Sequence, residues 1–191
     1  MKNIFIDCGT QLGQGLKNIC KLENVTNEWD VYSFEANPIT FEKIKKNKHV
    51  RYFNVAVSDR YDFLNFNCEK WDDENGFTGG GSTLVNLKYW NTDRVYGNKP
   101  EYLKTIVPVI DLTDFILKIK PEEKSIVLKI DIEGAEYNVL KKLKELELFK
   151  YIKKIYIEFH DHLLDNLDAT NNSDYWFNYC YYNNVTMEPW S

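Results

Sequence analysis

Short apolar runs alternate with stretches of helical periodicity along the first third of the chain. Buried strands are expected at Ile4–Ile6, Val31–Phe34 and Val50–Val57, because each is a brief, largely apolar run bounded by polar residues. Apolar residues recur at helical spacing from Leu16 to about Glu23, and Pro38 stands where a second helix is expected to begin. This order of strands and helices predicts a parallel sheet with right-handed crossovers.

The same alternation returns after an irregular middle segment. Further strands are expected at Phe63–Cys68, Thr105–Ile110, Ser125–Asp131 and Lys153–Phe159, with a last one near Val185, and further helices from Leu112, over Ala135–Leu143 and over Tyr175–Tyr182. Residues 69–104 are polar and aromatic without clear periodicity, so we interpret them as a loop insertion within a single domain of residues 1–191. The predicted fold class is α/β, with a mostly parallel, doubly wound, Rossmann-like sheet and an aromatic-rich insertion.

Composition and charge exclude several classes of function. A net charge of −5 argues against a protein that binds nucleic acid by neutralising its phosphates. The four cysteines form no C-x-x-C pair, so neither a zinc site nor a disulfide framework is indicated. The first strand begins too early for a signal peptide, and no apolar run approaches the ~18 residues of a membrane helix. We therefore expect a soluble, cytoplasmic protein without a nucleic-acid or membrane partner.

A glycine-rich segment follows the first expected strand. Ligands of doubly wound sheets bind at the carboxyl ends of the strands. The segment reads D-x-G-x-x-x-G from Asp7 to Gly13, which matches neither the phosphate-loop nor the dinucleotide-binding pattern. An acid just before the first glycine suits a cationic ligand, such as the sulfonium and ammonium groups of S-adenosylmethionine. A tight turn with no ligand is the alternative interpretation.

Two further strand ends are consistent with that donor. Glu35 ends the second strand, about twenty residues on, where a carboxylate accepts hydrogen bonds from ribose hydroxyls. A surface acid without a ligand is the alternative there. The segment Asn54–Asp59 ends the third strand, where an adenine ring can rest.

Seven ordered segments resemble the FkbM family of methyltransferases. They are IDCGTQLGQG, SFEANP, NVAVSD, GGGSTL, VPVIDLTDFI, VLKIDIEGAEYNVL and IYIEFH, and Lys129–Glu136 is the most specific piece. The resemblance implies a class I methyltransferase fold, S-adenosylmethionine as donor, and O-methylation, often of a sugar hydroxyl. The family usually has Ala-Asn where this chain has Thr10-Gln11, so donor contacts from these two side chains do not follow from the resemblance.

These observations together define a candidate site. The residues expected to bind the donor are Asp7, Gly9, Thr10, Gln11, Gly13, Glu35, Ala36, Asn37, Ser58 and Asp131. Ser82 and Glu133 are expected to bind the substrate, and the resemblance places Ser82 near the active centre.

Three residues at neighbouring strand ends are candidates for catalysis. Strand alternation and the expected strand order bring Asp131, Glu158 and His160 to one edge of the sheet. A hydroxyl needs a base or a metal to become a nucleophile, so Asp131 or His160 can act as general base, or Asp131 and Glu158 can hold a divalent cation. We favour the base. Packing against Asp161 is the alternative for His160, and stabilising the first turn of a helix is the favoured role of Glu136.

Other functions remain as alternatives. The chain lacks the G-x-G-x-x-G motif of a nicotinamide-dependent oxidoreductase. It also lacks the N-P-P-[YFW] motif of an amino-group methyltransferase of nucleic acids. A scaffold that binds the donor without turnover is a third alternative. The acceptor is expected to be a small molecule or a glycan, because aromatic side chains in residues 69–104 suit sugar rings, although they suit packing or a subunit contact as well.

Overall fold

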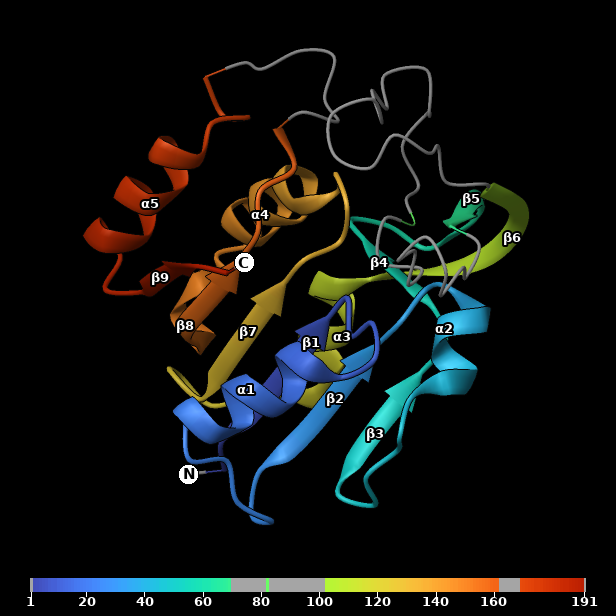
Figure 1. Ribbon diagram of the computed structural model, residues 1–191. Coiled ribbons are helices and arrows are strands. Elements are labelled where there is room, and N and C mark those ends of the chain that lie inside the picture. The colour runs from blue at the N-terminus through green and yellow to red at the C-terminus, as the bar shows by residue number, and fades with distance from the viewer. Residues whose placement is uncertain (1, 70–81, 83–101, 162–168, 191) are drawn as a thin grey trace.

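A six-stranded parallel sheet forms the centre of the protein (Figure 1). The computed structural model describes residues 2–69, 82, 102–161 and 169–190. The strand order is β3-β2-β1-β7-β8-β9, and every neighbouring pair is parallel. The strands are β1 (Ile4–Cys8), β2 (Asp30–Phe34), β3 (Val50–Phe53), β7 (Ile126–Ile130), β8 (Ile152–Ile157) and β9 (Thr186–Pro189).

Helices cover both faces of this sheet. They are α1 (Gln14–Leu22), α2 (Pro38–Lys43), α3 (Leu112–Ile119), α4 (Glu136–Glu145), the 3-10 helix η3 (Leu148–Tyr151) and α5 (Ser173–Tyr182). On one face, Leu16 and Ile19 of α1 pack against Phe5 of the sheet. On the other, helices α3, α4 and α5 share one apolar core with the strands, to which α5 contributes the fully buried Trp176. The predicted doubly wound α/β fold is confirmed.

A second, three-stranded sheet lies beside the first. It consists of β4 (Ala56–Ser58), β5 (Asp62–Glu69) and β6 (Tyr102–Asp111), in the order β4-β6-β5. Strand β6 is parallel to β4 and antiparallel to β5, with Phe66 and Val107 in the small core of this sheet. The sequence patterns identified β5 and β6 as strands but did not predict a separate sheet.

The prediction of one continuous strand over Val50–Val57 was wrong. The chain leaves the main sheet after β3 and enters the small sheet as β4. At the break, the Asn54 side-chain amide donates to the backbone carbonyls of Glu35 at 2.8 Å and Ala36 at 3.3 Å. These bonds fix the segment between β3 and β4 against the end of β2. The apolar run therefore contributes one strand to each sheet.

The other predicted elements lie where the patterns placed them, with ends shifted by a few residues. All four cysteines are free, as their spacing indicated. The aromatic residues of the expected insertion lie outside the described residues, except for Tyr102, whose side chain is not described. The glycines Gly79–Gly81 of the GGGSTL segment also lie outside the described residues. A single domain over residues 1–191 stays a prediction.

The order of the chain reverses at β1, which lies between β2 and β7. Just past its end, the N–H groups of Gly9 and Thr10 both donate to the Phe34 carbonyl at 3.0 Å, and the Asp131 N–H donates to the Cys8 carbonyl at 3.1 Å. A Cβ on Gly9 would lie 1.7 Å from the Asp131 carbonyl oxygen. Only glycine allows the two loops to approach this closely.

This contact predicts unequal costs for two glycine substitutions in one loop. Gly9 and Gly13 both have a φ in the left-handed region, at +85 and +89. A Cβ on Gly13 meets nothing within 4 Å, so Gly13→Ala should cost only the backbone term, about 1 kcal/mol. Gly9→Ala adds the collision with Asp131 and should destabilise by at least about 2 kcal/mol more. Urea denaturation of both variants measures the difference, and equal losses would contradict the close approach.

Candidate active site

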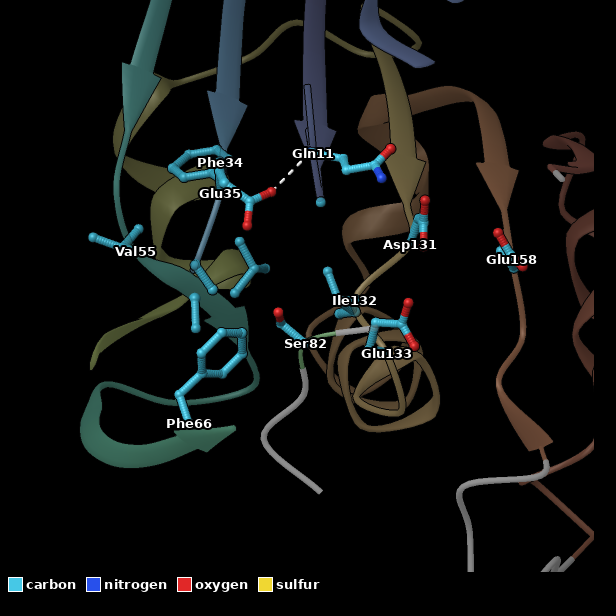
Figure 2. A pocket seen from close by; sticks show the side chains of 14 residues that line it. Gln11, Phe34, Glu35, Val55, Phe66, Ser82, Asp131, Ile132, Glu133 and Glu158 are labelled. Carbon is cyan, nitrogen blue, oxygen red and sulfur yellow. Dashed lines mark hydrogen bonds between the residues drawn. The ribbon is translucent and has the colours of Figure 1, made fainter. Parts of the chain in front are cut away.

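A cavity of about 230 Å³ opens at the carboxyl ends of the central strands (Figure 2). This volume suits a small molecule rather than one water or ion. Residues of the predicted site that line it are Gly9, Gln11, Glu35, Ala36, Ser82, Asp131, Glu133 and Glu158. The cavity thus lies where the strand order reverses, as expected for a doubly wound sheet.

Glu35 stands at the end of β2 with its carboxylate held by two backbone donors. Oε2 accepts from the Gln11 N–H at 2.7 Å, and Oε1 accepts from the Asn37 N–H at 2.8 Å. Burial raises the pKa of Glu35 to about 7, against the lowering effect of both hydrogen bonds. The glycine-rich loop after β1 therefore depends on Glu35 for its position, in addition to any ligand contact.

Several residues expected to bind the donor do not line the cavity. Asp7 is completely buried and accepts a hydrogen bond from the Thr10 hydroxyl at 2.8 Å, and that hydroxyl also pairs with Ser33. The side-chain Oδ1 of Asn37 accepts from the N–H of Ile39 at 2.9 Å and so caps α2. Gly13 and Ser58 also lie outside the lining. The side chains of Asp7, Thr10 and Asn37 therefore support the loops around the cavity rather than line it.

A buried lysine joins the loops after β1 and β7. Lys129 is 1% exposed, and its Nζ donates to the Gly9 carbonyl at 2.7 Å and to Oδ2 of Asp131 at 2.9 Å. Oδ1 of Asp7 lies 3.6 Å away. Burial alone would lower the pKa of Lys129, but the charges of Asp7 and Asp131 and the hydrogen bond to Asp131 outweigh it and raise the pKa. The ammonium group is therefore charged and fixes Asp131 at the edge of the cavity.

His160 lies between two glutamates. Its Nδ1 is 2.9 Å from Oε1 of Glu136, and its Nε2 is 3.3 Å from Oε2 of Glu133. The carboxylate of Asp161 accepts from the Tyr137 hydroxyl at 2.5 Å, and the suggested packing of His160 against Asp161 stays a prediction. Glu136 lies in the first turn of α4, where it was expected, and accepts from the N–H of Gly134 in the preceding loop at 3.1 Å. Its stabilisation of that turn stays a prediction.

The surroundings of His160 argue against its use as a general base. Burial alone would lower its pKa, but the hydrogen bond and charge of Glu136 and the charge of Glu133 outweigh burial and raise the pKa to about 9. An imidazole with that pKa already carries its proton near neutral pH. Burial also raises the pKa of Glu158, as does the nearby charge of Asp131. Of the three residues expected to act in catalysis, Asp131 and Glu158 line the cavity and His160 does not.

Ser82 connects the cavity wall to both sheets. Its hydroxyl accepts from the Asn37 side-chain amide at 3.0 Å and from the Glu69 N–H at 2.9 Å. The residue is 8% exposed and lines the cavity. The predicted position of Ser82 beside the candidate centre agrees with this placement, whereas its contact with a substrate stays a prediction.

Sequence reasoning missed the apolar wall of the cavity and the role of Lys129. Phe34, Val55 and Phe66 line one side of the cavity, which Figure 2 shows facing the carboxylates. Val55 lies in the segment expected to hold an adenine ring, but Phe66 belongs to the second sheet. The place of Lys129 within the apolar run Ser125–Asp131 could have identified it, because a lysine inside an apolar strand needs buried acceptors.

Comparison with known families agrees with this architecture. The family model described as the methyltransferase FkbM domain matches residues 7–181. This chain belongs to the FkbM methyltransferase family. The family membership expected from its seven segments is confirmed.

A solved structure supports the fold. The crystal structure of a methyltransferase FkbM from Methylobacillus flagellatus KT superposes with a TM-score of 0.53 at 14% sequence identity. The match covers 93% of this chain and 37% of that one, so this FkbM domain spans about a third of the length of its structural neighbour. A comparison with curated proteins finds no significant match. Among the described residues of this FkbM domain, no helix is long and apolar enough to cross a membrane.

Removal of the buried lysine should destabilise this FkbM domain strongly. Lys129→Met leaves Asp7 buried without its cationic partner, and we expect a loss of about 3–5 kcal/mol in the free energy of unfolding. The double variant Asp7→Asn with Lys129→Met removes both charges and should recover part of the loss. Urea denaturation measures both proteins, and equal stability of the single and double variants would contradict the coupling.

The raised pKa of Glu35 predicts a pH dependence of stability. The pKa of about 7 lies above the ordinary value for glutamate, so the stabilisation is complete at acidic pH and is lost as pH rises through 7. Glu35→Gln stays neutral and lacks this loss. The stability of the variant relative to wild type should therefore rise by about 3 kcal/mol between pH 5 and 8. Parallel stability curves for the two proteins, measured by urea denaturation, would contradict a buried titrating Glu35.

Proposed function

We propose that this FkbM domain is an S-adenosylmethionine-dependent O-methyltransferase that acts on a hydroxyl group of a sugar or glycan. The observation that carries the proposal is the cavity itself, in a chain of a methyltransferase family. Its lining combines a buried strand-end carboxylate, Glu35, a glycine-rich loop and an apolar wall, and it places a group of acids opposite them. These are the features that a nucleoside donor and a hydroxyl acceptor require.

The chemistry of the lining fits the donor. Glu35, Asp131, Glu133 and Glu158 contribute four carboxyl groups, and none of the described residues that line the cavity is basic. Such a surface suits a ligand with a sulfonium and an ammonium group and disfavours a pyrophosphate. The carboxylate of Glu35 would accept the ribose hydroxyls, and Val55 and Phe66 would contact the adenine ring.

The residues beside the donor supply the means to activate a hydroxyl. S-adenosylmethionine supplies the methyl group, so a carbon–oxygen bond forms as the carbon–sulfur bond breaks, and the hydroxyl proton must leave. Asp131 and Glu158 flank this part of the cavity, and either carboxylate can take that proton. The Lys129 ammonium group holds Asp131 in place for this role.

A polar acceptor agrees with the same surface. Carboxylates such as Glu133 and the hydroxyl of Ser82 accept hydrogen bonds from the several hydroxyls that a sugar presents. The alternative acceptor is a small molecule with one hydroxyl, and the alternative function is donor binding without turnover. A nucleic-acid acceptor is disfavoured because its phosphates would meet an acidic cavity and a chain of net charge −5.

Calorimetric titration with S-adenosylmethionine tests the proposal. Wild type should bind the donor, and Glu35→Ala should lose about 1.5–3 kcal/mol of binding free energy, the increment of a hydrogen bond to a charged acceptor. Glu23→Ala is the matched control, because Glu23 is an ion-paired acid that does not line the cavity. It should leave donor affinity unchanged.

Two other outcomes distinguish the alternatives. If wild type binds neither the donor nor its demethylated product, the proposed function is wrong. If it binds the donor but transfers no labelled methyl group to a panel of mono- and oligosaccharides and simple alcohols, the non-enzymatic donor-binding role becomes the better description.

A further inference from the structure

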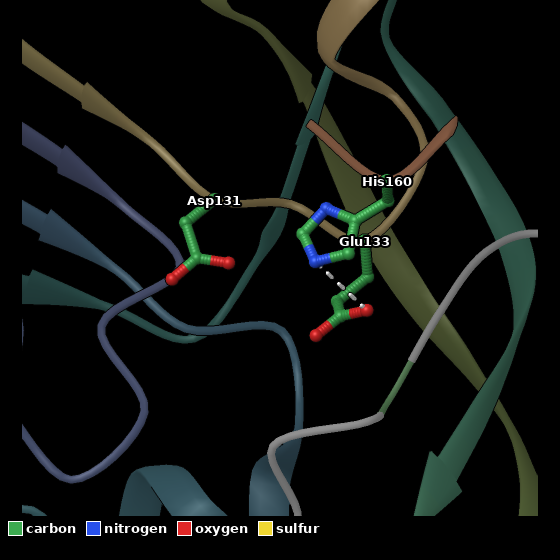
Figure 3. A group of neighbouring side chains, drawn as sticks. All are labelled: Asp131, Glu133 and His160. Atoms are coloured by element: carbon green, nitrogen blue, oxygen red, sulfur yellow. Dashed lines mark ion pairs between the residues drawn. The ribbon is translucent and has the colours of Figure 1, made fainter. Parts of the chain in front are cut away.

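Three side chains with metal-binding atoms gather at the edge of the cavity. One oxygen each from Asp131 and Glu133 and one ring nitrogen of His160 all lie within 4.8 Å of one another. Figure 3 shows the His160 nitrogen that pairs with Glu133 facing the space between the two carboxylates. Asp131 and Glu133 come from the loop after β7, and His160 follows β8, so adjacent strands of the main sheet fix all three.

The spacing is close to that of a coordination sphere. An ion about 2.1 Å from each ligand places adjacent ligand atoms about 3 Å apart and opposite ones about 4 Å apart. Nε2 of His160 lies 3.3 Å from Oε2 of Glu133. Asp131 is held through Oδ2 by Lys129 at 2.9 Å, and a carboxylate has a second oxygen to offer to an ion. Shifts of about 1 Å bring the three groups around one ion.

Glu136 orients the imidazole from behind. It is completely buried, and its Oε1 lies 2.9 Å from Nδ1 of His160, which leaves Nε2 directed at the cluster. The same carboxylate accepts from the N–H groups of Ile132 at 3.1 Å and Gly134 at 3.1 Å. A histidine that binds a metal commonly donates its other N–H to a carboxylate, which fixes the tautomer and the ring. Glu136 supports both the imidazole and the loop that carries the two acids.

The charge around this group is unbalanced. Asp131, Glu133, Glu136 and Glu158 surround one imidazole, and Glu158 lies 3.9 Å from its Nε2. The Lys129 ammonium group lies beside Asp131 but is shared with Asp7. Carboxylates gathered in a partly buried site are unfavourable unless cations balance them. A divalent cation that replaces the Nε2 proton of His160 and lies between Asp131 and Glu133 would supply that balance, because metal binding releases the protons of its ligands.

We propose that Asp131, Glu133 and His160 bind one divalent transition-metal ion. One imidazole and two carboxylates favour a first-row transition-metal ion over Mg²⁺ or Ca²⁺, which prefer oxygen ligands alone, and Mn²⁺ is the spectroscopic probe of such a site. The role of the ion in catalysis rests on the proposed function. An ion at this edge of the cavity lowers the pKa of an acceptor hydroxyl. Asp131 then serves as a ligand, and Glu158 is the carboxylate that takes the proton.

Titration of the metal-free chain with Mn²⁺, followed by electron paramagnetic resonance of the free ion, tests the site. One ion should bind per chain. Asp131→Asn, Glu133→Gln and His160→Gln should each weaken binding by at least about tenfold, and Glu136→Gln by about tenfold through the orientation of His160. Glu35→Gln removes a carboxylate from the same cavity but not from the cluster, so the affinity for Mn²⁺ should not change. Circular dichroism checks that each variant is folded.

A spectroscopic readout on wild type covers the case in which a variant does not fold. Electron spin-echo modulation of bound Mn²⁺ should show a coordinated ¹⁴N nucleus, because His160 is the only nitrogen ligand of the cluster. Absence of binding, absence of the nitrogen coupling, or equal affinities in wild type and the three ligand variants would overturn the proposal. Donor binding measured in chelator separates the two proposals. Donor binding without Mn²⁺ binding overturns only the metal site, whereas the reverse overturns only the proposed function.

Discussion

The burial of one ammonium group constrains the whole candidate site. Lys129 lies inside the sheet, 1% exposed, and a charged group there requires acceptors that do not move away. The parallel register places Asp7 directly opposite it, and the loop geometry adds the carbonyl of Gly9 and the carboxylate of Asp131. The ends of β1 and β7 are therefore tied together at the point where the strand order reverses. This contact helps to hold together two loops that diverge to opposite faces of the sheet.

The rest of the site is built outward from that contact. The loop after β1 turns at Gly9 and presents the Gln11 N–H to Glu35, so the loop and the Glu35 carboxylate hold each other in position. The loop after β7 places Asp131 at the cavity edge and continues to Glu133, whose φ of 54 is unusual for a residue with a side chain. Glu136 then holds that loop through its backbone N–H groups. The positions of Glu35 on one side of the cavity and of Asp131 and Glu133 on the other therefore both depend on the contact between the ends of β1 and β7.

Local patterns predicted the strands of the main sheet and, through the strand-end rule, the positions of Glu35 and Asp131. They failed at Asn54, because the apolar run continues across the break and only pairing with distant β6 reveals the second sheet. Phe66 could not be placed for the same reason. Asp7 and Thr10 bond to each other inside the protein because of the direction in which each side chain points at the end of β1. The spacing of residues in a glycine motif does not specify that direction.

A crystal structure of the chain with S-adenosylhomocysteine, the demethylated donor, tests the proposed donor site most directly. We predict the nucleoside in the cavity at the carboxyl ends of β1, β2 and β7, with both ribose hydroxyls donating to Glu35 and the sulfur directed toward Asp131. Clear density for the ligand at any other place, with the Glu35 carboxylate in contact only with Gln11 and Asn37, would contradict this prediction.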